Sequence, residues 1–181
     1  MSKPAIVLMS FLLFGTALHA GVAVTYSVGH KPYFTLQIPD SWRVNVGMET
    51  DASKVPAGEL APPRVITMMP DDDSILWFGA WVPVYVHSLD AAQEYLSSLD
   101  EYLVDNPVLL RTNELDLNTM PARYFIGKGG REGKPVDYFV MLFELSKENI
   151  GVAIYIGRPD TTNAHLEELR GMMKSITPIR E

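Results

Sequence analysis

The stretch that decides the fold is ARYFIGKGGREGKPVDYFVMLFELSKENIGVAIYIG, residues 122–157. It contains three runs rich in apolar, aromatic and β-branched residues, namely Ala122–Lys128, Val136–Leu145 and Gly151–Gly157. Runs of this length between turn residues are typical of strands. The segments between them, Gly127–Lys134 and Ser146–Asn149, are short enough to close hairpins. The stretch therefore predicts three consecutive antiparallel strands.

More strands and two helices are expected around this stretch. The sequence pattern predicts strands over 22–28, 33–38, 42–46, 64–69 and 108–117. The run 75–82 is apolar on both faces, which predicts a strand that is covered on both sides. One helix is expected to begin at Ser88, a favourable N-cap, and a second to run from Pro159 to Pro178. The proline-rich segment 48–63 predicts a surface loop. This order of elements indicates an α+β domain in which helices pack on an antiparallel sheet.

The strands at 33–38 and 42–46 each predict one buried face. Phe34, Leu36 and Ile38 alternate along the first strand, and Trp42, Val44 and Val46 alternate along the second. Because side chains of a strand point alternately to its two faces, each set lies on one side. We expect both sets to face the core.

The first twenty residues have the features of a secretory leader. Lys3 precedes an apolar run from Ala5 to Gly15, and Ala17 and Ala20 occupy the −3 and −1 positions of a cut before Gly21. The apolar run is shorter than the roughly 18 residues of a membrane span, so cleavage is favoured over retention as an anchor. We therefore expect a signal peptide at 1–20, a single domain at 21–181, and a periplasmic or secreted protein without membrane insertion.

Composition excludes several classes of function. The chain has 15 Lys and Arg against 22 Asp and Glu, a net charge of −7, and loss of Lys3 with the leader makes it −8. An acidic domain without a basic face argues against nucleic acid as a partner. The chain has no cysteine, which excludes disulfides, thiolate metal sites and cysteine nucleophiles. No cofactor or metal is expected.

Two stretches resemble the Mog/PsbP/DcrB superfamily. One is the strand Tyr33–Ile38 followed by Pro39-Asp40-Ser41-Trp42, and the other runs from Met120-Pro121-Ala122 through the three strands to Lys174-Ser175-Ile176. The resemblance implies a PsbP-like α/β/α sandwich with a curved antiparallel sheet. It also implies a protein that binds another protein and shares no common catalytic site with its relatives. The chain differs from DcrB-type lipoproteins because it has no lipidated cysteine.

The segment Gly127–Lys134 is a candidate partner contact. It contains Lys128, Arg131 and Lys134 in a chain that is otherwise acidic. Strands are expected on both sides, whereas phosphate-binding loops require glycines ahead of a helix. A hairpin tip is therefore the first interpretation, and a cationic tip that contacts an acidic partner is the second.

The aromatic strand at 75–82 is the other candidate. Trp77 and Trp81 share one face with Gly79 between them, and Phe78 points to the other. Core packing explains these residues most simply. The alternative is a ligand groove or a partner-binding face, because exposed aromatic residues dominate binding hot spots.

The remaining polar clusters carry no recognisable chemistry. Asp71-Asp72-Asp73 lacks the spacing of a calcium loop and predicts an acidic turn. His30, His87 and His165 have no metal-binding spacing, and no nucleophile motif is present. The leading hypothesis is a non-enzymatic accessory protein that binds another envelope protein. The alternatives are a small-molecule or lipid carrier with a pocket between sheet and helix, and an enzyme of undetected type.

Overall fold

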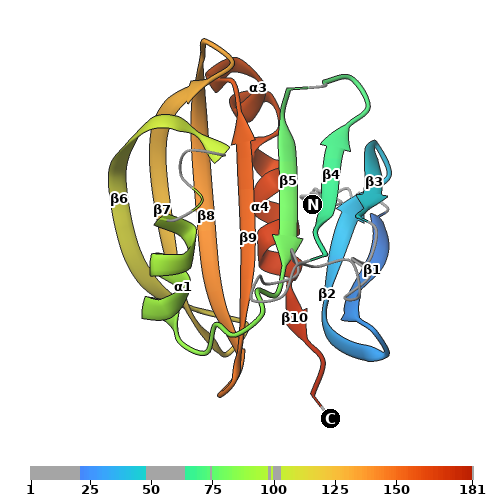
Figure 1. Cartoon of the computed structure of the whole chain (residues 1–181). Coiled ribbons are helices and arrows are strands. Elements are labelled where there is room, and N and C mark those ends of the chain that lie inside the picture. Colours follow the sequence, from blue (N-terminus) through green and yellow to red (C-terminus); the bar gives the residue numbers. More distant parts are fainter. Residues whose placement is uncertain (1–20, 48–63, 74, 98, 100–102, 181) are drawn as a thin grey trace, which may run out of the picture.

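The computed structural model describes residues 21–47, 64–73, 75–97, 99 and 103–180 (Figure 1). Most of its strands form one antiparallel sheet of seven, and three more form a second sheet. In spatial order the large sheet contains β3 (Trp42–Val46), β4 (Ile66–Pro70), β5 (Trp77–Trp81), β9 (Asn149–Gly157), β8 (Lys134–Ser146), β7 (Met120–Arg131) and β6 (Asp105–Leu117). The small sheet contains β1 (Gly21–Val28), β2 (Lys31–Pro39) and β10 (Thr177–Pro178).

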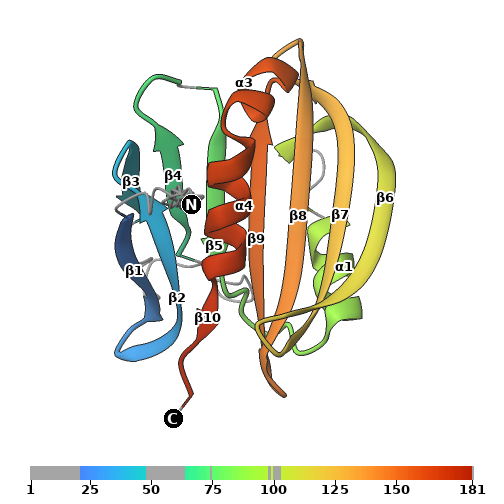
Figure 2. The same ribbon diagram turned by 180° about the vertical axis from the view of Figure 1, so that it is seen from behind.

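Helices cover both faces of the large sheet, which confirms the expected α+β class. On one face lies α1 (Leu89–Ser97), which begins where the Ser88 hydroxyl accepts a hydrogen bond from the Ala91 N–H at 3.1 Å. On the other face lie α3 (Pro159–Ala164) and α4 (Leu166–Ser175), as Figures 1 and 2 show. The small sheet packs on the same side as α4, because the Phe34 ring meets Phe143 edge-on with centroids 5.6 Å apart.

Core residues lie on both faces of the large sheet, against the small sheet and α4 on one side and against α1 on the other. Phe34, Leu36 and Ile38 are all buried, so the predicted inward face of β2 is confirmed. The prediction for β3 is wrong in part. Trp42 is buried, but Val44 and Val46 are 40% and 42% exposed. The physical reason is that β3 is an edge strand, and α4 reaches only its first residue.

Two other boundaries differ from expectation, and one expected segment is not described. The last helix is broken at His165 into α3 and α4. The strand expected from Val108 begins at Asp105 and contains two register shifts, at 105–108 and 109–111. Residues 48–63, expected to form a loop, lie outside the described residues.

Candidate functional site

The cationic hairpin is built differently from the expected loop. Gly129, Gly130 and Arg131 belong to β7 and pair with Val136, Pro135 and Lys134 of β8. The turn contains only Glu132 and Gly133, whose φ angles are 53° and 73°. Two successive positive φ angles are typical of the tight type I′ hairpin turn. The predicted eight-residue loop is therefore wrong, and the glycines extend the strand.

This pairing separates the three cations. Arg131 and Lys134 are direct cross-strand partners, so their side chains leave the same face of the sheet. Lys128 pairs with Asp137 and lies three residues from Arg131, so its side chain leaves the opposite face. The structure thus brings together two of the three predicted contact residues.

Trp77 lies on the same face as Arg131. Cross-strand pairs connect Trp77 to Ile156, Ile156 to Tyr138 and Tyr138 to Gly127, so these four residues share the face that α1 covers in part. Arg131 is four residues after Gly127 in β7 and therefore lies on this face too. The Arg131 guanidinium carbon lies 5.5 Å from the centre of the Trp77 ring. This distance is within the range of a cation–π contact.

A groove of about 430 Å³ surrounds this contact. Its residues come from β4, the segment before β5, β5 itself, and the β7–β8 hairpin. We call it the tryptophan groove, and it is lined by Thr67, Met69, Ile75, Trp77, Arg131, Glu132, Lys134 and Val136. The predicted partner residues Trp77, Arg131 and Lys134, distant in sequence, therefore line one concave surface.

Two of the residues that line the groove each contain a hydrogen-bond donor without a partner among the described residues. Trp77 Nε1 and Arg131 Nη1 are shielded from solvent, and neither has a hydrogen-bond partner in the described part of the chain. Buried polar groups nearly always find a partner. The cations Arg131 and Lys134 line the groove, and their charge suits a ligand with acceptor oxygens, such as a carboxylate.

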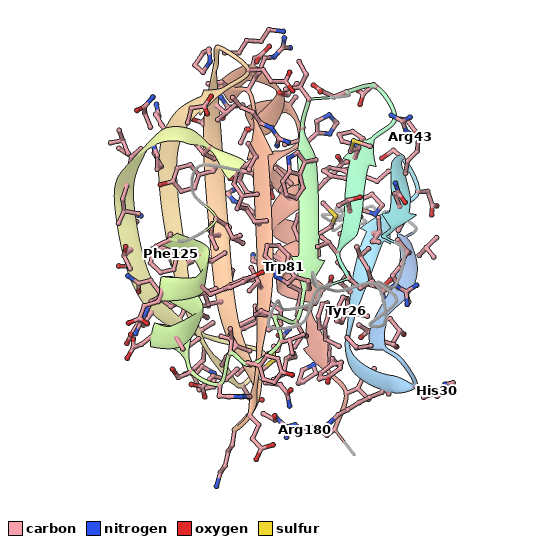
Figure 3. The ribbon with its side chains drawn as sticks, viewed as in Figure 1. Tyr26, His30, Arg43, Trp81, Phe125 and Arg180 are labelled. Carbon is pink, nitrogen blue, oxygen red and sulfur yellow. The ribbon has the colours of Figure 1, made fainter. Side chains whose placement is uncertain are left out.

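Trp81 does not belong to this groove. It is only 4% exposed and forms part of the core (Figure 3). Its pairing with Val152 places it further along β5, towards the end of the sheet where α1 packs. Core packing, the simplest interpretation of this residue, is confirmed by its burial.

A second groove of about 270 Å³ lies on the opposite face, between α4 and the sheet. Three parallel rings form its floor, Tyr124 on β7, Phe139 on β8 and Tyr155 on β9. We call it the tyrosine groove. Its other lining residues are Leu115, Leu117, Ile126, Met141, Leu166, Leu169, Arg170, Met173 and Lys174. The alternation of β7 and β8 and the apolar stripe of α4 were visible in the sequence, but their meeting was not.

A polar cluster at the α3–α4 junction has a structural role. Glu168 accepts hydrogen bonds from Trp42 Nε1 at 3.0 Å and Ser41 Oγ at 3.3 Å, and His165 Nδ1 lies 2.7 Å from its carboxylate. Burial raises the pKa of Glu168, but the hydrogen bonds from His165 and Trp42 lower it by more, so the pKa lies below its usual value. His165 Nε2 also lies 3.4 Å from Asp72. The cluster ties two turns of the sheet to the break between the helices.

The carboxylates of the acidic turn at 71–73 contact nearby residues. Asp71 forms an ion pair with Arg43 at 3.1 Å, and Asp73 accepts hydrogen bonds from the N–H groups of Ile75 and Leu76. Burial raises the pKa of Asp73, and these hydrogen bonds outweigh it, so the pKa is lowered. Within the described ranges, no group of three or more His, Asp or Glu residues is placed to hold a metal ion.

Of the three residues at the predicted cleavage site, the structure describes only Gly21. Ala17 and Ala20 lie outside the described residues, and Gly21 is the first residue of β1. No helix in the described part of the chain is long and apolar enough to cross a membrane.

Comparison with known proteins supports the fold. No family model matches the sequence, and no curated protein matches it significantly. The structure is similar to cyanobacterial PsbP (CyanoP) from Synechocystis sp. PCC 6803, with a TM-score of 0.58 and 8% identity over 91% of this chain and 96% of that one. This match supports a PsbP-like fold.

Two further solved structures are similar at lower scores. One is LpqN, involved in cell envelope biogenesis of Mycobacterium tuberculosis, with a TM-score of 0.47 and 14% identity over 89% of this chain and 91% of that one. The other is PA94 from Pseudomonas aeruginosa, with a TM-score of 0.49 and 12% identity over 88% of this chain and 99% of that one. Neither adds to the conclusion that the CyanoP match carries.

Proposed function

We propose that this chain is a non-enzymatic accessory protein of the cell envelope, and that it binds another envelope protein through the tryptophan groove. The expected leader at residues 1–20 supports a periplasmic or secreted location. The PsbP-like fold agrees with the resemblance that implies protein binding.

The observation that carries the proposal is the Arg131–Trp77 contact beside Lys134. Tryptophan and arginine are the residues most enriched in binding hot spots, which lie in concave, poorly hydrated places. Here both residues line a groove and keep an unused N–H donor. A partner that supplies carboxylates would match the charge of Arg131 and Lys134 and exclude the remaining water.

The charge of the groove indicates an acidic segment of the partner. Arg131 and Lys134 are two cations against one carboxylate, Glu132, in a chain that is acidic overall. Such charges mainly raise the rate of association, and salt screens them over about 8–10 Å. Binding through this groove should therefore weaken as salt is added.

Site-specific photo-crosslinking in intact cells tests the proposal. A photoreactive amino acid at Thr67 lies in the groove, and one at the exposed Thr25 of β1 is the positional control. We expect one envelope protein to crosslink from position 67 and not from position 25. The Arg131→Ser variant should lose most of this product.

Lys128 provides a matched control for charge. Lys128→Ser removes one cation from the same strand as Arg131→Ser, but from the opposite face. We expect this variant to crosslink as the unmodified protein does. Equal losses in the two variants, or no product from position 67, would refute binding through the tryptophan groove.

A carrier of a small apolar molecule is the second candidate function. The tyrosine groove favours it, because nearly all of its lining is apolar and it lies between the sheet and a helix.

A further inference from the structure

The large sheet is only partly covered on the α4 side. Figure 2 shows α4 running along β5 and β9 and α3 lying at the end of β9 and β8, whereas β7 and β6 curve away without a helix over them on this side. The tyrosine groove follows this boundary. Apolar side chains on this part of the sheet are therefore reachable from outside.

The floor of the groove is a row of three aromatic rings. The centroids of Tyr124 and Phe139 are 5.5 Å apart with 16° between the ring planes, and those of Phe139 and Tyr155 are 5.6 Å apart with 8°. Because the rings come from three neighbouring strands, they form one continuous apolar surface across the sheet. All three are half-buried, so part of each ring faces the groove.

The walls of the groove are apolar as well. Leu169 and Met173 of α4 stand on one side, and Leu115 and Leu117 of β6 stand on the other. The volume of about 270 Å³ lies just below the range of roughly 300–1,000 Å³ of most small-molecule sites. A groove of this size and chemistry fits one narrow apolar chain.

Two cations mark the α4 rim. Arg170 and Lys174 are four residues apart and therefore lie on the same side of the helix, one turn from each other. Arg170 pairs with Glu167 at 2.7 Å, whereas Lys174 forms no ion pair with any residue in the described ranges. Burial raises the pKa of Tyr155, Asp137 raises it further, and Arg170 lowers it, so the charges of both Asp137 and Arg170 act on the floor of the groove.

We infer that the tyrosine groove binds a medium-length fatty acid, with its acyl chain on the three rings and its carboxylate at Lys174 and Arg170. The aromatic floor and leucine walls remove the chain from water, and the rim supplies the opposite charge to the head group. This binding is independent of the tryptophan groove on the other face of the sheet.

Calorimetric titration of the purified protein with laurate, below its micelle concentration, tests the inference. We expect saturable binding with a negative heat-capacity change, because apolar surface is buried. Affinity should rise from octanoate to decanoate to laurate by up to about fourfold for each methylene. Undecyl maltoside, which has the same alkyl chain as laurate and a neutral head, should bind less tightly than laurate.

Paired variants locate the site. Lys174→Gln should weaken laurate binding about two- to fivefold, as expected for one exposed charge contact. Leu115→Ser should weaken it about fourfold. Its control is Leu109→Ser, which removes an exposed leucine from the same strand, since Leu109 lies beside Phe125 and Tyr138 on the other face. Lys134→Gln, in the tryptophan groove, is the charge control.

Each outcome decides for or against the site. Loss of affinity in Lys174→Gln and Leu115→Ser with neither control affected supports it. Absence of laurate binding, or an equal effect of Leu109→Ser or Lys134→Gln, overturns it. Arg131→Ser should leave laurate binding unchanged, so failure of this inference and failure of partner binding at the tryptophan groove can be told apart.

Discussion

Trp42 is the residue that anchors the turn between β2 and β3. Its indole ring is 5% exposed, its N–H donates to Glu168, and its ring meets His165 edge-on with centroids 5.8 Å apart. Trp42→Ala should lower the free energy of unfolding by about 3–5 kcal/mol, as for other buried large aromatic residues. Urea unfolding followed by circular dichroism measures this loss, and an unchanged midpoint would contradict the assigned role.

Glu168 makes the stability of the fold depend on pH. Its pKa is lowered in the folded state, so the carboxylate stabilises the fold above its unfolded pKa, near 4.5. This contribution is lost as the pH falls through the lower, folded-state pKa. At pH 6–7, Glu168→Gln should therefore have a lower free energy of unfolding than the unmodified protein. Towards pH 3 the two free energies of unfolding should approach each other.

Urea unfolding at a series of pH values measures the difference between the two proteins. Glu167→Gln removes the same charge from an exposed neighbouring position and is the control for net charge. A difference between Glu168→Gln and the unmodified protein that is constant with pH would show that the carboxylate charge is not what Trp42 and His165 stabilise.

At the scale of elements, the β7–β8 turn offers a route to higher stability. Glu132 adopts a positive φ, which costs a residue other than glycine roughly 1–2 kcal/mol, and asparagine tolerates this conformation better. Glu132→Asn should raise the free energy of unfolding by about 0.5–1 kcal/mol on that account. Thermal unfolding checks this. Glu148→Asn is the matched control in the β8–β9 turn, where no positive φ occurs, and it should give no gain.

The edge strand β6 exposes an apolar run. Val108, Leu109 and Leu110 are all exposed, and among the described strands β6 pairs only with β7. Open strand edges promote association, and bulges such as those at 105–111 discourage it. Leu110→Lys should slow aggregation on heating while changing the free energy of unfolding by less than about 0.5 kcal/mol. Light scattering measures the aggregation, and an unchanged rate would show that it begins elsewhere.

Alternation of apolar and polar residues correctly predicted which side chains are buried where a strand has one covered face. Phe34, Leu36 and Ile38 are an example, because core atoms lie over all three. The same pattern failed at Val44 and Val46, since exposure there depends on how far α4 reaches across the edge of the sheet. It also failed at Gly129, where Val104 occupies the space that a side chain would fill, and where local sequence alone suggested a loop.

The two grooves show a similar limit. Trp77, Arg131 and Lys134 could be selected singly, by residue type and local charge. Their meeting could not be predicted, because it requires β9 and β8 to lie between β5 and β7. The tyrosine groove requires in addition that α4 cover only part of its face. Strand order and helix placement are properties of the whole chain, and no local pattern encodes them.

At the scale of the whole molecule, the leader prediction can be checked directly. Processing before Gly21 should give a protein that begins with the first residue of β1. Mass spectrometry of the protein recovered from the cell envelope measures its N-terminus. Ala20→Trp should block processing, because the −1 position accepts only small residues. A full-length chain in the membrane fraction of the unmodified protein would contradict the prediction.

The position of β2 between β1 and β10 constrains the order of folding during biosynthesis. The Tyr33 carbonyl accepts a hydrogen bond from the Ile179 N–H, and Thr35 pairs with Thr177, so an early strand is completed by residues that are synthesised much later. Contacts between such distant segments close a long loop and form slowly. The small sheet cannot be finished until residues 177–178 have been synthesised and have left any pore through which the chain is threaded. A nascent chain released early, before residue 177, would leave one edge of β2 unpaired, and quality-control proteases would have time to act on it.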